Sequence, residues 1–174
     1  MYVARHRTDW NDLKIIQGTT DIDLNEQGIE ETKNLARTLD LRNIDICLCS
    51  PLSRTKKTAE ILTQGKIKII YDDLIVERGY GDYEGKKIDM ELIARQWDYK
   101  LNDSSNKVES IKDCLARAEK FLKKIKKEYY NQNILIVTHG GFMKALHFAI
   151  KGYDENTDFL SFFAGNSELC EYII

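Results

Sequence analysis

The chain has little proline, little net charge and no long apolar run, and two of these shortages exclude partners. Its 174 residues include one proline, and 26 basic and 28 acidic side chains leave a formal net charge of −2. This balance does not favour a nucleic-acid partner, which usually needs a basic surface. No apolar run approaches the roughly 20 residues of a membrane span, so no membrane partner is expected.

Cysteine is also scarce, and its spacing does not indicate a metal site. The cysteines form no C-x-x-C pair, and they are Cys47, Cys49, Cys114 and Cys170. We interpret them as small buried thiols. His139 and His147 have no i, i+4 relation and no accompanying carboxylate motif, so no metal and no other cofactor is expected.

The residues that are present indicate one ordinary globular domain over residues 1–174. Hydrophobic residues make up 43% of the chain and charged residues 31%. A first strand beginning near Met1 leaves no room for a signal peptide, so a cytoplasmic location is expected. Oligomeric state stays open, with a homodimer as one option.

Apolar strand-like runs alternate with segments of helical period. Strands are predicted at 2–5, 44–49, 67–70, 134–138, 159–163 and 168–173. Amphipathic stripes predict helices over 29–39 and 108–125, and a further helical run covers 142–150. Ser50-Pro51 resembles a helix start, because serine caps helices and proline suits the first helical position. This alternation predicts an α/β domain with helices on both sheet faces.

Two histidines follow predicted strands. His6 comes directly after Arg5 at the end of the first strand, and His139 follows the run 134–138. The edge beyond the carboxyl ends of strands is where open α/β sheets bind ligands. Arginine holds phosphate through two parallel hydrogen bonds, and a neutral imidazole beside it can attack phosphorus. The pair indicates chemistry on an anion, with phosphate the first choice.

Other residues could complete such a site. Arg54 lies just inside a predicted helix N-terminus, where free N–H groups favour an anion. Gly140-Gly141 after His139 would let the backbone approach a ligand closely. His147 lies inside a helical run and is interpreted as structural.

A proton donor for the leaving oxygen is expected in the glycine-rich, charged loop 76–85. A carboxyl group near a bound anion can serve. Glu77, Asp82 and Glu84 are all candidates, and the composition of the loop does not choose among them.

Together these residues resemble the histidine phosphatase superfamily, which includes the cofactor-dependent phosphoglycerate mutases. The matching motifs run in the family's order over nearly the whole chain: Arg5-His6 with Thr8, Trp10 and Asn11; Gln17 to Asp21; Leu24 to Gly28; Ser50 to Arg54 with Thr58-Ala59; Glu77, Gly81 and Glu84-Gly85; Thr138 to Gly141; and Asn166-Ser167. The resemblance implies a phosphoglycerate mutase-like fold, a three-layer α/β/α sandwich around a mixed, mostly parallel sheet of about six strands.

The resemblance also implies roles. His6 would be the nucleophile that forms a phosphohistidine, and Arg5, Arg54 and His139 would form the phosphate pocket, with His139 as the positively charged partner. Glu77 takes the place of the family's proton donor. Substrate contacts are implied at Thr8, Asn11, Gln17, Gly18, Arg78, Tyr80 and Gly140. No metal is implied, because the arginines and histidine supply the positive charge.

One departure from the family pattern follows the nucleophile. The family reads Arg-His-Gly-x-Thr-x-Trp-Asn, whereas this chain runs directly from His6 to Arg7 and Thr8, one residue shorter. The missing glycine belongs to the loop around the phosphate, and Arg7 could add charge to the pocket or crowd it.

Three functions remain open. The first is a metal-independent phosphomonoesterase that acts on a small phosphorylated metabolite through phosphohistidine. The second is a phosphoglycerate mutase, which keeps an arginine directly after the proton donor, as Arg78 is here. A mutase must exclude water, however, which usually takes a longer lid and tail than residues 85–107 and the end at Ile174 provide. The third is an inactive phosphate-binding relative, suggested by the shortened loop.

Overall fold

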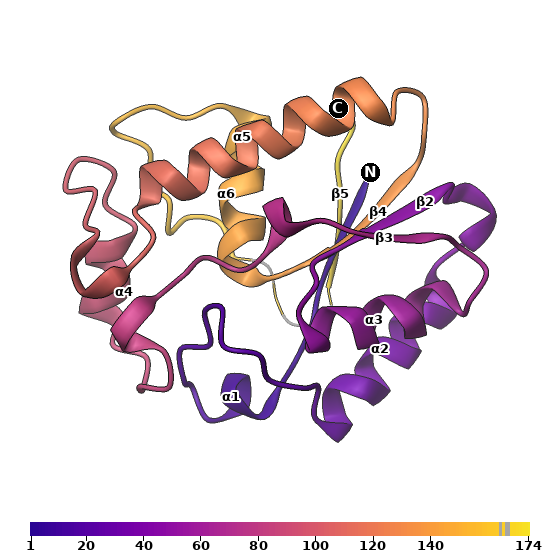
Figure 1. Ribbon diagram of the computed structural model, residues 1–174, viewed down its shortest axis with the longest axis horizontal. Helices are drawn as coiled ribbons and strands as arrows, with labels where there is room; N and C mark the ends of the chain where they lie inside the picture. Colours follow the sequence, from indigo (N-terminus) through magenta and orange to yellow (C-terminus); the bar gives the residue numbers. More distant parts are fainter. Residues whose placement is uncertain (164, 166–167) are drawn as a thin grey trace.

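A mixed five-stranded sheet forms the centre of the computed structural model, which describes residues 1–163, 165 and 168–174 (Figure 1). The strands are β1 (Tyr2–Arg5), β2 (Ile46–Cys49), β3 (Ile69–Tyr71), β4 (Ile134–Thr138) and β5 (Leu169–Glu171), in the order β3-β2-β4-β1-β5. The first four are parallel, and β5 runs antiparallel to β1. The α/β sandwich predicted from the sequence is confirmed.

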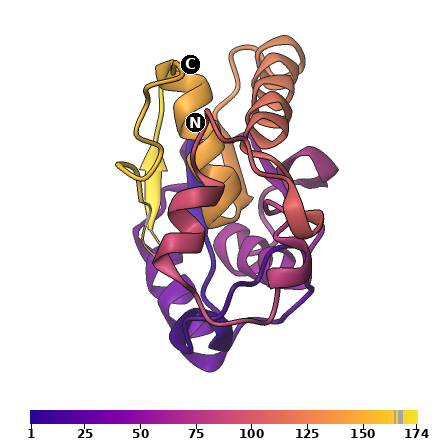
Figure 2. The same cartoon turned by 90° about the vertical axis from the view of Figure 1, so that its left-hand side faces the viewer.

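Helices cover both faces of the sheet (Figures 1 and 2). On one face, α5 (Ile111–Glu128) and α6 (Gly140–Lys151) pack against Val3, Leu48 and Ile136. On the other, α2 (Glu26–Thr38) and α3 (Ser53–Thr63) pack against Ala4, Cys47 and Val137. All residues of β2 and β4 are buried, as expected for strands that are covered on both sides.

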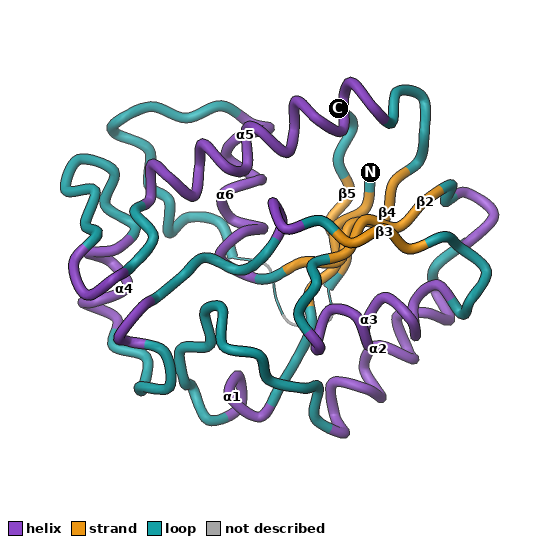
Figure 3. Tube along the Cα trace, in the orientation of Figure 1, coloured by secondary structure: helices purple, strands orange, loops and turns teal. Residues whose placement is uncertain are grey.

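Shorter elements and loops connect these strands and helices (Figure 3). They include α1 (Asp9–Asp12), α4 (Met90–Gln96) and the 3-10 turns Leu41–Asn43, Asp73–Ile75, Gly81–Tyr83 and Ser105–Lys107. The predicted amphipathic stripes are confirmed as α2 and α5. Within the described part of the chain, no helix is both long and apolar enough to cross a membrane.

The predicted strand at 159–163 is wrong. This segment forms turns in which the side chain of Asp158 accepts a hydrogen bond from the N–H of Leu160 at 2.9 Å. Phe159 is buried among other aromatic rings. Its ring centroid lies 4.7 Å from that of Phe148 and 6.0 Å from that of Tyr99, so its burial does not come from a sheet. Asn166-Ser167, which also match the family, lie outside the described residues.

The helix start predicted at Ser50-Pro51 is also wrong, because α3 begins at Ser53. Asp21, from a distant loop, accepts hydrogen bonds from the N–H of Ser53 at 2.8 Å and from its hydroxyl at 2.7 Å. Ser50 has another partner, since its Oγ lies 2.7 Å from His139 Nε2. A contact across the fold has therefore replaced the local cap.

Two structural interpretations are confirmed. Cys47, Cys49 and Cys114 are buried free thiols, and burial raises the pKa of Cys47 to about 12, whereas Cys170 is a free thiol that is only half-buried, so the prediction holds for three of the four cysteines. His147 stacks on Phe162 with ring centres 3.8 Å apart and hydrogen-bonds the hydroxyl of Tyr172.

Candidate active site

The pairing of β1 with β4 brings the two strand-end histidines together. Arg5 is level with Thr138 in the register, so the next residues, His6 and His139, leave the sheet side by side. His6 Nε2 lies 2.8 Å from His139 Nδ1, and the two rings meet edge to face. Both side chains are almost completely buried.

Arg54 joins this pair from the first turn of α3. Its Nε lies 3.2 Å from both His6 Nε2 and His139 Nδ1. Its terminal nitrogens donate to the carbonyl oxygens of Gly18 and Thr20, each at 2.8 Å. These four contacts hold a fully buried guanidinium in one orientation beside the two imidazoles.

Burial and positive neighbours keep both imidazoles neutral. The pKa of His6 is lowered well below its usual value by desolvation, with Arg54 and Arg5 adding to the effect. Desolvation also lowers the pKa of His139, together with His6 and the arginines. A neutral His6 has the lone pair that nucleophilic attack needs. Positive charge on His139 therefore has to come with an anionic ligand.

The hydrogen bond between Ser50 and His139 helps to set which ring nitrogen carries the proton between His139 and His6. If His139 Nδ1–H donates to His6 Nε2, then His139 Nε2 accepts from the Ser50 hydroxyl, and the lone pair of His6 lies at Nε2. His6 Nδ1 is buried and has no hydrogen-bond partner among the described residues. The tautomer of His6 is thus set only through Nε2.

Glu77 is held at the N-terminus of α6. Its carboxylate accepts hydrogen bonds from the backbone N–H groups of Arg78 at 2.8 Å, Phe142 at 2.9 Å and Gly141 at 3.1 Å. It also lines the pocket that His6 lines. Glu77 is thus held by three backbone N–H groups beside the same pocket as His6.

The other carboxylates of this loop are engaged elsewhere. Asp82 pairs with Lys107 and does not line the pocket. Glu84 accepts hydrogen bonds from Thr19, Thr20 and Tyr80. Partial burial opposes ionisation of Glu84, but these hydrogen bonds together lower its pKa. Of the three candidates, Glu77 is therefore the one that lines the pocket.

The two glycines after His139 make room for the site. A Cβ at Gly140 would lie 2.9 Å from Cζ of Arg5, and one at Gly141 would lie 2.7 Å from Oε1 of Glu77. Any side chain at these positions would displace the arginine or the glutamate.

The resulting pocket has a volume of about 310 Å³. Of the residues predicted from sequence, it is lined by Arg5, His6, Asn11, Gln17, Gly18, Glu77, Tyr80 and Gly140. Arg54 and His139 are fully buried and reach the pocket through His6. The side-chain oxygen of Gln17 is buried and has no hydrogen-bond partner in the part of the chain that the structure describes, so it remains available to a ligand.

Thr8 and Arg78 lie outside the pocket lining. Thr8 is the N-cap residue of α1, and its N–H and hydroxyl both donate to Asn11 Oδ1. Arg78 is fully buried and donates to the carbonyl oxygens of Gln96 and Glu109. Its guanidinium also lies over the ring of Trp97, 4.5 Å from the centroid. Both residues thus hold neighbouring segments in place.

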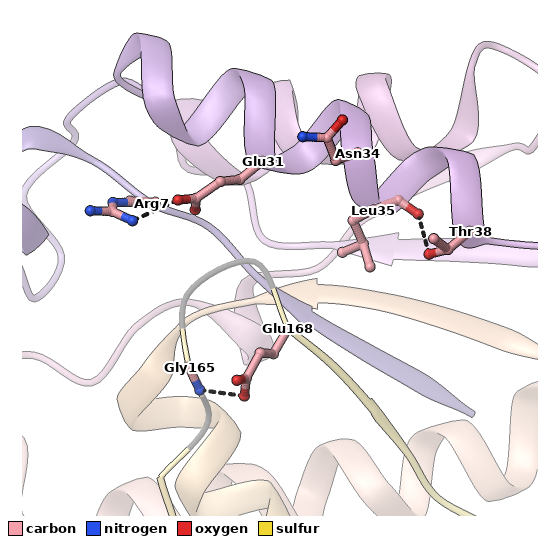
Figure 4. Close-up of a pocket in the computed structure, with 7 residues that line it drawn as sticks. All are labelled: Arg7, Glu31, Asn34, Leu35, Thr38, Gly165 and Glu168. Carbon is pink, nitrogen blue, oxygen red and sulfur yellow. Dashed lines mark hydrogen bonds and ion pairs between the residues drawn. The ribbon is translucent and has the colours of Figure 1, made fainter.

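Arg7, in the shortened loop, neither charges nor crowds the pocket. Its guanidinium pairs with Asp12 at 2.7 Å and with Glu31 of α2 at 2.6 Å. A second pocket next to it lies between α2 and the segment before β5 (Figure 4). Of the described residues lining that pocket, Arg7 is the one cation and is already paired, while Glu31 and Glu168 are acidic. It therefore does not favour a phosphate.

Sequence reasoning missed much of the pocket wall. Lys144 lines the pocket, together with an apolar set made of Ile15, Ile16, Ile88, Met90, Ile93, Trp97, Leu160 and Phe163. One signal was available: Lys144 lies one helical turn after Gly140 and therefore on the same face of α6. The apolar wall comes from loops and α4, which have no such signal.

The comparisons with known proteins agree with this geometry. Residues 1–172 match the histidine phosphatase superfamily (branch 1). Phosphoserine phosphatase 1 of Hydrogenobacter thermophilus is 30% identical over 162 residues, covering 88% of this chain and 77% of that protein. A 2,3-bisphosphoglycerate-dependent phosphoglycerate mutase of Methylobacterium is 30% identical over 173 residues, covering 90% and 83%.

Solved structures give the same result. The phosphoserine phosphatase of Entamoeba histolytica in complex with 3-phosphoglyceric acid superposes with a TM-score of 0.80 at 26% identity, covering 97% of this chain and 87% of that one. Fold and paired histidines thus define a phosphoryl-transfer protein of the phosphoglycerate mutase type. The chain belongs to the histidine phosphatase superfamily.

Proposed function

We propose that the chain is a metal-independent phosphomonoesterase that acts on a small phosphorylated metabolite through a phosphohistidine at His6. The observation that carries this proposal is the placement of His6 Nε2, 3.2 Å from the Arg54 guanidinium and 2.8 Å from His139, in a pocket that Glu77 also lines. Phosphatases among the relatives support the hydrolytic reaction.

The reaction takes place in two steps. His6 Nε2 attacks phosphorus, an N–P bond forms, and the P–O bond to the alcohol breaks while Glu77 gives its proton to the leaving oxygen. Water then attacks the phosphohistidine, returning a proton to Glu77, and the N–P bond breaks to release phosphate. Arg5, Arg54 and His139 stabilise the negative charge on the transferring group.

The runner-up is a phosphoglycerate mutase, and the similarity to a mutase favours it. It shares the first step but returns the phosphoryl group to a second substrate oxygen. Against it, Arg78 is engaged by Gln96, Glu109 and Trp97 and does not line the pocket. An inactive phosphate-binding relative is the third reading, for which the buried, unpartnered Nδ1 of His6 is the observation.

A phosphate-release screen beside a His6→Ala variant tests the proposal. Wild-type protein should release phosphate from sugar phosphates, phosphoglycerates, phosphoserine or aryl phosphates, and should carry acid-labile phosphate that His6→Ala lacks. His147→Asn, a histidine outside the pocket, is the matched control and should keep activity. Interconversion of 3- and 2-phosphoglycerate in a coupled assay would favour the mutase. Vanadate binding without turnover would favour the inactive relative.

A further inference from the structure

Lys144 is a buried cation on the wall of the pocket. It lies in α6, four residues after Gly140, and is 8% exposed. Four residues of helix correspond to a rise of about 6 Å, and helical side chains lean back towards the N-terminus. The ammonium group is therefore brought over the same pocket as Arg5, one helical turn from the phosphate end.

The ammonium group of Lys144 has no hydrogen bond or ion pair with any described residue. Its recorded contact is with the ring of Trp97, 4.8 Å from the centroid. Arg54, which is fully buried, instead donates hydrogen bonds to the carbonyl oxygens of Gly18 and Thr20. An unpaired buried charge is costly, so this position favours a ligand with an acceptor for it. Accordingly, desolvation lowers the pKa of Lys144 to about 8.

The phosphate end of the site is already supplied with positive charge. Arg5 and Arg54 lie there beside the two histidines, whereas Lys144 borders an apolar wall that includes Ile93 and Trp97. Among the described residues that line the pocket, Arg5 and Lys144 are the two cations. A substrate with one anionic group would use the first and leave the second unpaired.

We propose that Lys144 is a specificity-determining residue that binds a carboxylate on the organic part of the substrate. The substrate class is then a compact phosphomonoester that carries a carboxylate, with its carbon chain against the apolar wall. This inference rests on the proposed phosphatase function and deepens it. A polyhydroxylated sugar phosphate fits less well, because apart from Asn11, Gln17 and Tyr80 most of the uncharged side chains that line the pocket are apolar.

Matched substrate pairs test this inference. O-phosphoserine and O-phosphoethanolamine differ by a carboxylate, and glycerol 3-phosphate has a hydroxymethyl group where 3-phosphoglycerate has its carboxylate. Lys144→Met keeps the bulk of the side chain and removes its charge. It should lower kcat/KM for the two carboxylates by about 10- to 100-fold, mainly through KM, and leave the other two substrates essentially unchanged. Lys144→Arg should restore part of the preference.

Lys86→Met is the matched control. Lys86 is an exposed lysine over Tyr83, near the pocket but not in its lining, and its replacement should leave the preference as it is. An equal loss on all four substrates after Lys144→Met would overturn the inference, since Lys144 would then act on the phosphate or on the fold. No loss on any of them would overturn it too.

Binding separates this inference from the proposed function. In a His6→Ala background, calorimetry should show weaker binding of 3-phosphoglycerate after Lys144→Met and no change for glycerol 3-phosphate. This binding test remains valid even if the wild-type protein hydrolyses none of the substrates. In that case the proposed phosphatase function is wrong, and the inference about Lys144 is still tested. Equal binding of 3-phosphoglycerate with and without Lys144 overturns the inference whatever the activity.

The unchanged protein offers a measurement that needs no variant at Lys144. The charged groups that act on this lysine are Asp158 and Glu77, which favour its protonation, and Arg78 and Arg5, which oppose it. The ratio of kcat/KM for 3-phosphoglycerate to that for glycerol 3-phosphate should fall as pH rises through about 8.

Discussion

Arg7 donates a hydrogen bond to Glu31 of α2 over 2.6 Å, and this contact decides what the shortened loop after His6 does. The same guanidinium also pairs with Asp12, so the loop is tied to the helix side of the molecule and Arg7 stays out of the pocket. The loop can therefore be one residue shorter and still present His6 to His139.

Removing the ion pairs of Arg7 is expected to lower both the stability and the activity of the protein. Arg7→Met removes two partly buried ion pairs and should lower the free energy of unfolding by about 1 kcal/mol. It should also lower kcat, because the residue after the nucleophile is no longer held. Urea denaturation and steady-state kinetics measure the two effects. Arg42→Met breaks an exposed pair with Asp40, far from the histidines in sequence, and should change neither quantity.

The effect of replacing Glu77, the proposed proton donor, should depend on the leaving group. Glu77→Gln keeps the shape but has no proton to give, so kcat for alkyl phosphates should fall by about 10²- to 10⁴-fold. An aryl phosphate such as p-nitrophenyl phosphate, whose leaving group needs no proton, should lose much less. Asp82→Asn, in the same loop but paired with Lys107, is the control and should resemble wild type. A loss that is uniform across leaving groups would remove Glu77 from this role.

Gly140 should tolerate no side chain without a loss of activity. The Cβ of Gly140→Ala would press on the end of the Arg5 side chain, which is flexible, so the fold should change little while the guanidinium moves. A shift of about 1 Å in such a group costs on the order of a hundredfold in kcat/KM. Gly79→Ala meets neighbours at ordinary contact distances of 3.7 Å or more and is the control. Equal activity of the two variants would contradict the close packing.

Stability should fall on the acid side of neutrality. His6 and His139 have pKa values well below 6.5 in the folded protein, chiefly through desolvation. In the unfolded chain they take up protons near pH 6.5, so the unfolded state binds more protons below that pH and is favoured. The loss of stability that these two histidines cause is therefore absent above about pH 7 and grows as pH falls through 6.5.

Melting temperatures from pH 8 to pH 5 measure this effect. The difference between the wild-type protein and a His6→Gln variant isolates one of the two histidines, and the difference should grow towards low pH in favour of the variant. Phosphate or vanadate should reduce the acid-side loss, because a bound anion stabilises protonated imidazole. A pH-independent difference would mean that His6 titrates normally in the folded protein.

Much of the architecture could be predicted because its signals are local. The run 134–138, which is apolar except for Thr138, is the central strand, and the stripe along 111–125 is the buried face of α5. The strand predicted at 159–163 was wrong because an aromatic residue such as Phe159 can be buried in a cluster of rings as well as in a strand. The helix start predicted at Ser50-Pro51 was wrong because the side chain that caps α3 is that of Asp21, twenty-nine residues before Ser50 in the chain.

The sequence by itself determined which residues can do chemistry and the order in which strands and helices present them. The tertiary structure decided how those residues are used, because a long polar side chain chooses among partners that only the folded chain brings near. It turned Arg7 towards α2, engaged Arg78 with backbone carbonyl oxygens, and placed Glu77 in the pocket at the N-terminus of α6 while Asp82 pairs with Lys107. It also left Lys144 buried beside the pocket and unpaired among the described residues, whereas the helical spacing from Gly140 indicates only the face of α6 on which it lies.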